Sequence, residues 1–288
     1  MTMRIKNVSK SFNKKLALDN VSLEFGDNKI YGLLGNNGAG KTTLFNIITS
    51  RLFADNGEIT LDNNNLCDDD KILSQMYMLS EKNYYPESMT VNEALGWAEK
   101  LYKNFDMAVA NDIANRFQLP LKSKITDLST GYGTIFKIAV ALSVNTPLLL
   151  LDEPVLGLDA GHRDMFYKLL IERYTKNPCT IVISTHLIAE AANLIEHCFI
   201  IKDGRIIEDS PCEALVSKGY SISGPKSLVD EFIKQKDVIY ENNLGGLKTA
   251  SIKGEVPDEA PEGLEISRLN LQEYFINLVG NNTTSGRG

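Results

Sequence analysis

The segment Gly35-Asn36-Asn37-Gly38-Ala39-Gly40-Lys41-Thr42 carries the strongest structural signal in this chain. It matches the pattern G-x-x-x-x-G-K-[ST] at every fixed position, and apolar runs stand on both sides of it, at residues 30–34 and 44–48. Glycines let the backbone wrap a phosphate chain with its N–H groups pointing inward, and the positive end of the following helix faces the anion. The alternative, a glycine-rich turn without a ligand, would not need this strand and helix. The pattern predicts a phosphate-binding loop in which Lys41 reaches the β- and γ-phosphates and Thr42 offers its hydroxyl to Mg²⁺.

A pair of carboxylates follows an apolar strand further along the chain. Four consecutive leucines at 148–151 predict a buried strand that ends at Asp152 and Glu153. A carboxylate at such a strand end can hold Mg²⁺, and its neighbour can accept a proton from an attacking water. His186 follows a β-branched strand at 180–184. A lone histidine is more often structural or exposed, so only the other motifs make His186 a candidate for contact with a γ-phosphate.

The composition is that of an ordinary globular chain. Of its 288 residues 43% are apolar and 23% are charged, which suits one large domain or one large and one small domain. The formal charge of −7 and the lack of a basic run argue against a nucleic-acid partner. No apolar run approaches the roughly 20 residues that span a bilayer, and the first residues lack the apolar core of a signal peptide.

Cysteine usage indicates reduced thiols in the cytosol. The cysteines are widely spaced and form no C-x-x-C pair, so the sequence favours neither a zinc framework nor a disulfide scaffold. They are Cys67, Cys179, Cys198 and Cys212.

The order of apolar patterns predicts an α/β fold with a mostly parallel sheet that helices cover on both faces. Strands are expected at residues 5–8, 16–18, 21–25, 29–34, 57–62, 76–79, 148–151, 180–184, 198–202 and 205–208. Helices are expected at 91–102, 113–117, 165–174 and 187–196. The first of these helices starts with the spacing of a capping box, with Thr90 as N-cap and Glu93 three residues on.

The pattern of predicted elements changes at Gly219, after which the strands and helices are shorter. We expect a nucleotide-binding domain at residues 1–216, which includes a helical subdomain at about 88–146. A small α/β accessory domain is expected at 217–279, and a polar, disordered tail at 280–288.

The motifs, in this order, resemble those of the ATP-binding subunits of ABC transporters over residues 3 to about 210. The segment Leu128-Ser129-Thr130-Gly131-Tyr132 stands at the place of the family signature, and residues 155–159 match the D-loop. His186 matches the switch histidine, and Phe12 matches the aromatic residue that stacks on adenine. The resemblance implies a P-loop NTPase fold of ABC type, with an N-terminal antiparallel β subdomain and a helical subdomain.

The resemblance also implies the members of the site. ATP would contact Phe12, Gly35, Asn36, Asn37, Gly38, Ala39, Gly40, Lys41, Thr42, Thr43, Ser129, Thr130, Gly131 and Asp159. Mg²⁺ would be held by Thr42, Asp152 and Glu81, and Glu153 and His186 would be catalytic. In the family's geometry the signature of one subunit completes the site of another, so ATP joins two subunits arranged head to tail.

Three positions depart from the family pattern. Thr130 replaces the first signature glycine, Tyr132 replaces a glutamine, and Glu81 stands where the family usually has the Q-loop glutamine. Thr130 adds a side chain beside the expected γ-phosphate contact, and Glu81 brings a charge in place of an amide. These changes argue against fast, uncoupled turnover but not against nucleotide binding.

The function that the resemblance implies is ATP hydrolysis that powers a membrane exporter. The partners would be a second ATPase subunit, identical or related, and separate permease subunits, with this chain on the inner face of the cell membrane. The pattern is most similar to exporters of Gram-positive bacteria whose cargo is a peptide or an antimicrobial compound. Two alternatives stay open: a soluble ABC-type ATPase not linked to transport, and a slow ATP-dependent regulatory module.

Overall fold

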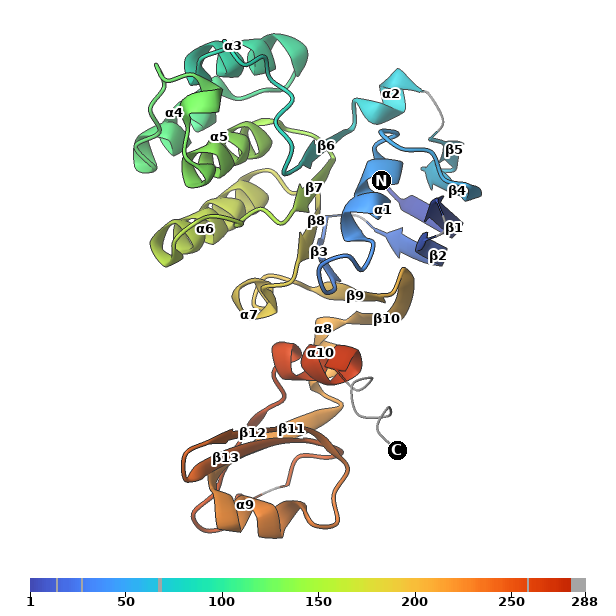
Figure 1. The fold of residues 1–288 in the computed structure, drawn as a ribbon, viewed down its shortest axis with the longest axis vertical. Coiled ribbons are helices and arrows are strands. Elements are labelled where there is room, and N and C mark those ends of the chain that lie inside the picture. The colour runs from blue at the N-terminus through green and yellow to red at the C-terminus, as the bar shows by residue number, and fades with distance from the viewer. Residues whose placement is uncertain (14, 27, 67–68, 258, 281–288) are drawn as a thin grey trace.

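A six-stranded sheet forms the centre of the molecule (Figure 1). This computed structural model describes residues 1–280 except 14, 27, 67–68 and 258. The order in the sheet is β10-β9-β3-β8-β7-β6, and all neighbours are parallel except β10 and β9. The strands are β3 (Ile30–Leu34), β6 (Met76–Leu79), β7 (Leu148–Asp152), β8 (Thr180–Thr185), β9 (His197–Lys202) and β10 (Arg205–Pro211). The predicted α/β fold with a mostly parallel sheet is confirmed.

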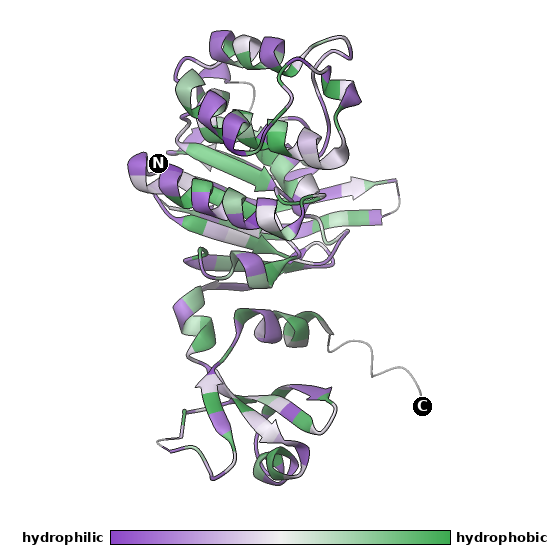
Figure 2. Ribbon diagram, turned by 90° about the vertical axis from the view of Figure 1, so that its left-hand side faces the viewer, coloured by the Kyte–Doolittle hydropathy of each residue, from purple (hydrophilic) through white to green (hydrophobic). Residues whose placement is uncertain are grey.

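Both faces of this sheet are buried, which explains the unbroken apolar strands in the sequence. Along β7, Leu149 and Leu151 belong to one hydrophobic cluster, whereas Leu148 and Leu150 belong to another on the opposite face. Figure 1 shows α1 (Lys41–Ile48) on one side of the strands and α5 (Thr130–Ser143) and α6 (Ala160–Lys176) on the other. Figure 2 shows the central strands in the green of hydrophobic residues.

An antiparallel sheet in the order β2-β1-β4-β5 packs beside α1. Its strands are β1 (Met3–Phe12), β2 (Lys15–Phe25), β4 (Asn56–Leu61) and β5 (Asn64–Asn65). The two strands predicted at 16–18 and 21–25 are in fact one. Asn20 lies between them in the left-handed conformation, with φ at 52°. Because asparagine tolerates this conformation, the chain bulges there and pairing with β1 continues.

The helices α3 (Val91–Leu101) and α4 (Met107–Arg116) and the 3₁₀ turn η1 (Ile125–Asp127) form a layer with α5 beyond β6 and β7 (Figure 1). Three short helices lie elsewhere: α2 (Asp70–Leu73) beside the antiparallel sheet, and α7 (Ile188–Ala191) and α8 (Cys212–Val216) near β9 and β10. The helix predicted at 187–196 is wrong in extent, because α7 is a single turn. The chain after α7 is instead tied to the sheet: the Glu196 N–H donates to the Ile30 carbonyl at 2.9 Å, and the Ile30 N–H donates to a Glu196 carboxylate oxygen at 3.0 Å.

The last part of the chain forms a third sheet, antiparallel, in the order β12-β13-β11-β14. Its elements are β11 (Gly219–Pro225), α9 (Lys226–Ile233), β12 (Val238–Leu244), β13 (Leu247–Lys253), β14 (Glu265–Arg268) and α10 (Leu271–Gly280). This sheet has a small hydrophobic cluster of its own, to which Tyr220, Ile222 and Val229 belong. The division at residue 217 stays a prediction, and residues 281–288 of the predicted tail lie outside the described residues.

Helix α10 contacts both parts of the molecule, between the third sheet and α8 (Figure 1). On one side Leu271 and Phe275 belong to the largest hydrophobic cluster, which also contains the central strands. On the other side the Glu273 carboxylate accepts hydrogen bonds from the Ser221 and Ser251 hydroxyls, at 2.9 and 2.6 Å. Among the described residues, no helix combines the length and apolar character needed to cross a bilayer.

The capping box predicted at the start of α3 is confirmed and can be tested. The Thr90 hydroxyl accepts from the Glu93 N–H at 3.3 Å, and the Glu93 carboxylate accepts from the Thr90 N–H at 2.8 Å. We expect Thr90→Ala to lower stability by about 1 kcal/mol because the cap is lost, and the thermal midpoint by about 2–3 °C. Thr175→Ala, at an exposed position of α6, is the control and should leave the midpoint unchanged. An equal loss in both variants would contradict the role of the cap.

Candidate functional site

A cleft of about 400 Å³ lies at the carboxyl ends of the parallel strands, where ligands bind in open α/β sheets. The residues that line it are Phe12, Lys15, Ala17, Asn37, Gly38, Gly40, Lys41, Thr42, Thr43, Glu81, Glu153, Leu156 and His186. They come from the end of β1, the start of β2, the loop between β3 and α1, and the segments that follow β6, β7 and β8. The structure thus brings most of the predicted site together, from segments far apart in the sequence.

The loop before α1 has space for glycine alone at two positions, Gly35 and Gly40, and a Cβ on Gly35 would stand 2.6 Å from the Ile201 carbonyl oxygen. Gly40 has a φ of +113°, and a Cβ there would stand 2.7 Å from the Ala17 carbonyl oxygen. At Gly38, also at positive φ, an added Cβ would meet nothing within 4 Å, so the backbone there is open. Gly35 and Ala39 are buried, and Asn36 is exposed outside the cleft lining. These three therefore shape the loop through the backbone rather than with side chains.

Lys41 is a buried cation of the cleft, with 5% of its surface exposed. Its ammonium donates to the Gly35 carbonyl at 2.7 Å and to the Asn36 carbonyl at 3.3 Å. It also lies 3.2 Å from Glu153 Oε1. The loop therefore holds its own lysine inward, and Glu153 supplies the counter-charge that a buried ammonium requires.

Glu153 stands in an unusual backbone conformation, with φ at +46°. Its N–H donates to the Ser184 carbonyl at 2.9 Å, which fixes the turn after β7 against the end of β8. Its Oε2 is 2.9 Å from His186 Nδ1. Its Oε1 is buried without an aligned hydrogen bond among the described residues, because the contact with Lys41 is an ion pair only. Such strain, of order 1–3 kcal/mol, is typical of functional positions and aims this carboxylate into the cleft.

Asp152 is 4% exposed and has different surroundings from Glu153. Its Oδ1 accepts a hydrogen bond from the Ser184 hydroxyl at 2.7 Å. Burial raises the pKa of the Asp152 carboxyl above its ordinary value, and hydrogen bonds from the Ser184 and Thr42 hydroxyls act in the opposite direction. The Thr42 hydroxyl therefore lies near the Asp152 carboxylate, where the end of β7 packs against the start of α1.

This pair fits a magnesium ion, which prefers oxygen ligands and keeps several waters or phosphate oxygens. The described residues bring no group of three or more His, Cys, Asp or Glu side chains together, so the protein offers a half-built shell rather than a closed cage. Asp152 and Thr42 would hold the ion and phosphate oxygens would complete the shell. Glu81 lines the same cleft but is exposed, and its backbone carbonyl accepts a hydrogen bond from Lys137 Nζ.

The predicted signature residues and Asp159 lie outside this cleft. The Ser129 hydroxyl accepts from the Tyr132 N–H at 3.3 Å and caps α5, and Asp159 accepts from the His162 N–H at 2.9 Å and caps α6. The His162 N–H is the main cause that lowers the pKa of the Asp159 carboxyl. Within one chain, both side chains therefore act as helix caps.

The signature and the loop before α6 nevertheless touch each other. A Cβ on Gly131 would stand 3.1 Å from the Gly157 carbonyl oxygen, and a Cβ on Gly157 would stand 2.9 Å from Thr130 Cγ2. The Thr134 hydroxyl donates to the Leu156 carbonyl at 2.9 Å. The methyl group that Thr130 adds to the signature is thus in contact with this loop.

Sequence reasoning missed Lys15, Ala17 and Leu156 as lining residues. Lys15 is paired with Phe12 across the turn from β1 to β2, so the hairpin carries a cation to the aromatic ring. Phe12 is 48% exposed, and Lys10 Nζ lies 5.9 Å from its ring centroid. A hairpin prediction at residues 12–15 would have found Lys15, whereas the positions of Ala17 and Leu156 depend on tertiary packing.

Known proteins share this architecture and sequence pattern. The sequence profile of the family described as ABC transporter matches residues 18–156. The ABC transporter ATP-binding protein YtrB of Bacillus subtilis (strain 168) is 27% identical over 96% of this chain and 98% of its own length. The lantibiotic transport ATP-binding protein SrtF of Streptococcus pyogenes is 29% identical over 71% of this chain and 89% of its own. The petrobactin import ATP-binding protein YclP of Bacillus subtilis (strain 168) is 29% identical over 74% and 88%.

A solved structure gives the same fold. The dimeric structure of a post-hydrolysis state of the ATP-binding cassette MJ0796, bound to ADP and Pi, aligns with a TM-score of 0.64 and 25% identity. The alignment covers 73% of this chain and 98% of that one.

The crowding at Gly40 gives a direct test of the loop. We expect Gly40→Ala to reduce affinity for a fluorescent ADP about tenfold or more, because the side chain is strained at this φ and collides with the Ala17 carbonyl. Gly96→Ala in α3 is the matched control: an added Cβ meets nothing within 4 Å, so affinity should be retained. Wild-type affinity in Gly40→Ala would contradict the assignment of the loop.

Proposed function

We propose that this chain, which is similar to ATP-binding proteins of ABC transporters, is the ATP-hydrolysing subunit of a membrane exporter. The observation that carries the proposal is the continuous contact from Lys41 through Glu153 to His186, at 3.2 and 2.9 Å, on the floor of the cleft. It combines a phosphate-binding cation, a base and a third polar group in one place. Such a set serves hydrolysis, and nucleotide binding alone would not need it.

The residues of the cleft have separate tasks in this proposal. The loop N–H groups and Lys41 hold the phosphates, while Phe12 offers a flat apolar face to adenine. Glu153 orients a water and accepts its proton as the oxygen attacks the γ-phosphorus and the bond to ADP breaks. His186 steadies Glu153 and faces the γ-phosphate. When bound between Thr42 and Asp152, Mg²⁺ offsets the charge of the β- and γ-phosphates.

The proposed site is completed by a second subunit. Ser129, Thr130, Gly131 and Asp159 do not reach the cleft of their own chain. The related cassette MJ0796 is dimeric with ADP and Pi bound, which supports such an arrangement. ATP would then bind two subunits together, and hydrolysis would release them. The partner subunit would be a second copy or a related chain.

The direction of transport and the cargo are the finer parts of the proposal. A relative named for lantibiotic transport supports a peptide or antimicrobial cargo moved outward. A relative named for petrobactin import supports transport in the opposite direction. The contact of Thr130 with Gly157 favours slow turnover, so a regulatory ATPase is the second candidate function.

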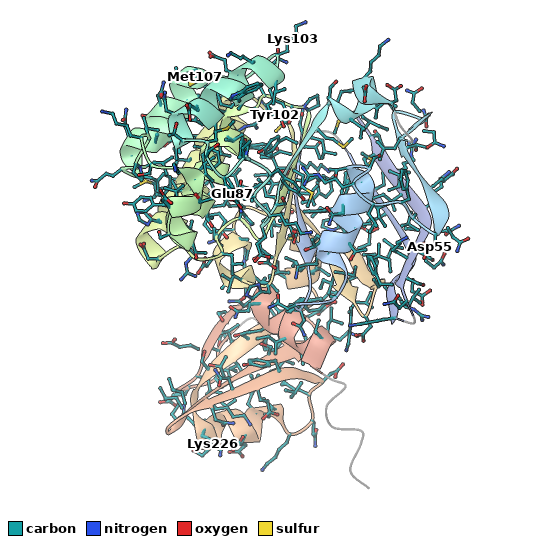
Figure 3. All side chains as sticks on the ribbon, turned by 45° about the horizontal axis from the view of Figure 1, so that its top comes forward. Asp55, Glu87, Tyr102, Lys103, Met107 and Lys226 are labelled. Atoms are coloured by element: carbon teal, nitrogen blue, oxygen red, sulfur yellow. The ribbon has the colours of Figure 1, made fainter. Side chains whose placement is uncertain are left out.

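A second cleft, of about 390 Å³, offers a surface for the membrane subunits, which would hold the chain at the inner face of the membrane. It lies between the sheet and the helical layer, where Figure 3 shows Tyr102, and Tyr77 packs edge-on against that ring at 5.4 Å. Tyr84 is 62% and Trp97 51% exposed beside it. Lys137 lines this cleft and donates a hydrogen bond to the carbonyl of Glu81. Because Glu81 lines the nucleotide cleft, this bond connects the two clefts.

The catalytic proposal predicts the behaviour of Glu153→Gln. The amide cannot accept a proton, so we expect ATP turnover to fall about 100-fold or more while ATP still binds. An ATP-dependent dimer should then accumulate, as measured by light scattering on a sizing column. Glu172→Gln, an exposed glutamate on α6, is the control and should turn over normally. Unchanged turnover in Glu153→Gln would remove this residue from the catalytic role.

The permease proposal predicts that charge in the second cleft disrupts assembly. We expect the double variant Tyr84→Glu, Trp97→Glu to lose co-purification with the polytopic membrane subunit that the wild-type chain binds, because two carboxylates would be buried in the contact. ADP affinity should stay at the wild-type level. Leu247→Glu, at a position 57% exposed on the third sheet, is the control. Full co-purification of the double variant would place the permease contact elsewhere.

A further inference from the structure

A third cleft, of about 670 Å³, lies at the amino ends of β7 and β8. The nucleotide cleft lies at the carboxyl ends of the same strands. We call the third cleft the amide-lined cleft. Its lining residues are Met1, Asn28, Asn104, Asn145, Thr146, Pro147, Arg173, Asn177, Pro178, Cys179 and Thr180. Most of them come from the connections before β3, between α3 and α4, between α5 and β7, and between α6 and β8, while Met1 is the first residue, Arg173 lies in the last turn of α6 and Thr180 begins β8. Neither the nucleotide site nor the proposed permease surface uses any of these residues.

The chemistry of this lining is one-sided. Among the residues that the structure describes, it contains four asparagines and no aspartate or glutamate, although the chain as a whole carries a net charge of −7. Asn28, Asn104 and Asn177 are exposed around the rim, whereas Arg173 is 7% exposed. The cleft therefore presents neutral amide donors above one buried cation.

Arg173 has no carboxylate partner among the described residues. One NH2 group donates to the Cys179 sulfur at 2.8 Å, and the other donates to the Val144 carbonyl at 3.0 Å. Its Nε is buried and has no hydrogen-bond partner in the described part of the chain. A guanidinium has five N–H donors, so protein acceptors of no formal charge match two of them. Buried charges are normally paired, because desolvation of an unpaired ion is costly.

Capping of helix ends accounts for part of this arrangement only. Val144 is the C-cap of α5, and Arg173 lies in the last turn of α6, so the guanidinium meets the negative ends of two helices. Each helix end supplies roughly half a unit of negative charge and acts over about one turn. That explains why the cation is tolerated at this depth. It does not satisfy Nε, nor does it explain why amides surround the opening.

We propose that the amide-lined cleft binds a small oxyanion, a carboxylate or a phosphate, through the Arg173 guanidinium and the asparagine amides of its rim. A planar guanidinium matches either anion with paired hydrogen bonds, and side-chain amides donate to the remaining oxygens. The bound anion would lie at the C-terminal ends of α5 and α6, the two helices that Ser129 and Asp159 cap at their N-terminal ends. It would thus be a ligand separate from the nucleotide.

The test is a titration followed by NMR with the full chain, saturated with ADP and Mg²⁺ so that the phosphate loop is occupied. Inorganic phosphate and acetate are added separately, and sodium chloride keeps the ionic strength constant. We expect saturable shifts of the Arg173 Nε–H signal and of the Asn145 and Asn177 amide signals with at least one probe. Saturation by phosphate alone identifies a phosphoryl ligand, and saturation by acetate alone identifies a carboxylate ligand.

Exposed Asn177 gives variants that do not endanger the fold. Asn177→Asp places a negative charge beside the anion and should weaken binding about tenfold, whereas Asn177→Lys should strengthen it by a similar factor. Asn243→Asp makes the same charge change at an exposed position of β12 and should leave affinity unchanged. Arg173→Gln should abolish binding.

Three results would each overturn the proposal. The first is the absence of a saturable shift with either probe up to ~100 mM, well beyond the range of a specific site. The second is an equal shift with chloride alone. The third is equal affinity in Asn177→Asp and Asn177→Lys, which would show that the anion does not lie in this cleft.

Discussion

The buried ammonium of Lys41 is the constraint on which the rest of the site depends. A cation that is 5% exposed needs acceptors on every side, and it finds them in the Gly35 carbonyl and the Glu153 carboxylate. Glu153 is in turn held by the end of β8, through the Ser184 carbonyl. The strand order β3-β8-β7 makes this chain of contacts possible, because it places three carboxyl ends side by side. The parallel sheet therefore places the phosphate-binding loop and the two carboxylates together at the carboxyl ends of its strands.

The two adjacent carboxylates are separated in task by their surroundings. Asp152 is enclosed and accepts hydrogen bonds from hydroxyl groups, and burial raises the pKa of its carboxyl, so its charge is best stabilised by a cation beside it. Glu153 leaves the strand with a left-handed turn that reverses the direction of its side chain and aims it between Lys41 and His186. Neighbouring residues in a regular strand point to opposite faces, and this strained turn lets Glu153 line the cleft while Asp152 stays buried at the end of β7. Strain of about 1–3 kcal/mol is small beside the benefit of a base held in position.

Local signals in the sequence predicted most of the fold, and long-range packing accounts for the errors. The phosphate loop, the leucine strand and the capping box at Thr90 are each specified by residues next to one another. The bulge at Asn20 and the short α7 depend on residues far away in the sequence. Strand β2 stays paired with β1 on both sides of Asn20, and hydrogen bonds with Ile30 hold Glu196, which follows α7. Periodicity carries no information on such partners. The same limit applies to the site, since Ala17 lines the cleft only because the antiparallel sheet packs against the loop.

The helix caps at Ser129 and Asp159 connect the nucleotide cleft with the surface that the proposed partner subunit would meet. Leu156 lines the cleft and accepts a hydrogen bond from Thr134, one turn into α5, while Thr130 packs on Gly157 in the same loop. A shift of the segment after Glu153 would therefore move the start of α5 directly, without passing through the sheet. Glycine in place of Thr130 would remove the methyl contact and loosen this link. Thr130 thus couples the start of α5 more rigidly to the segment after Glu153. This coupling fits the proposal that ATP turnover is slow until the partner subunit binds.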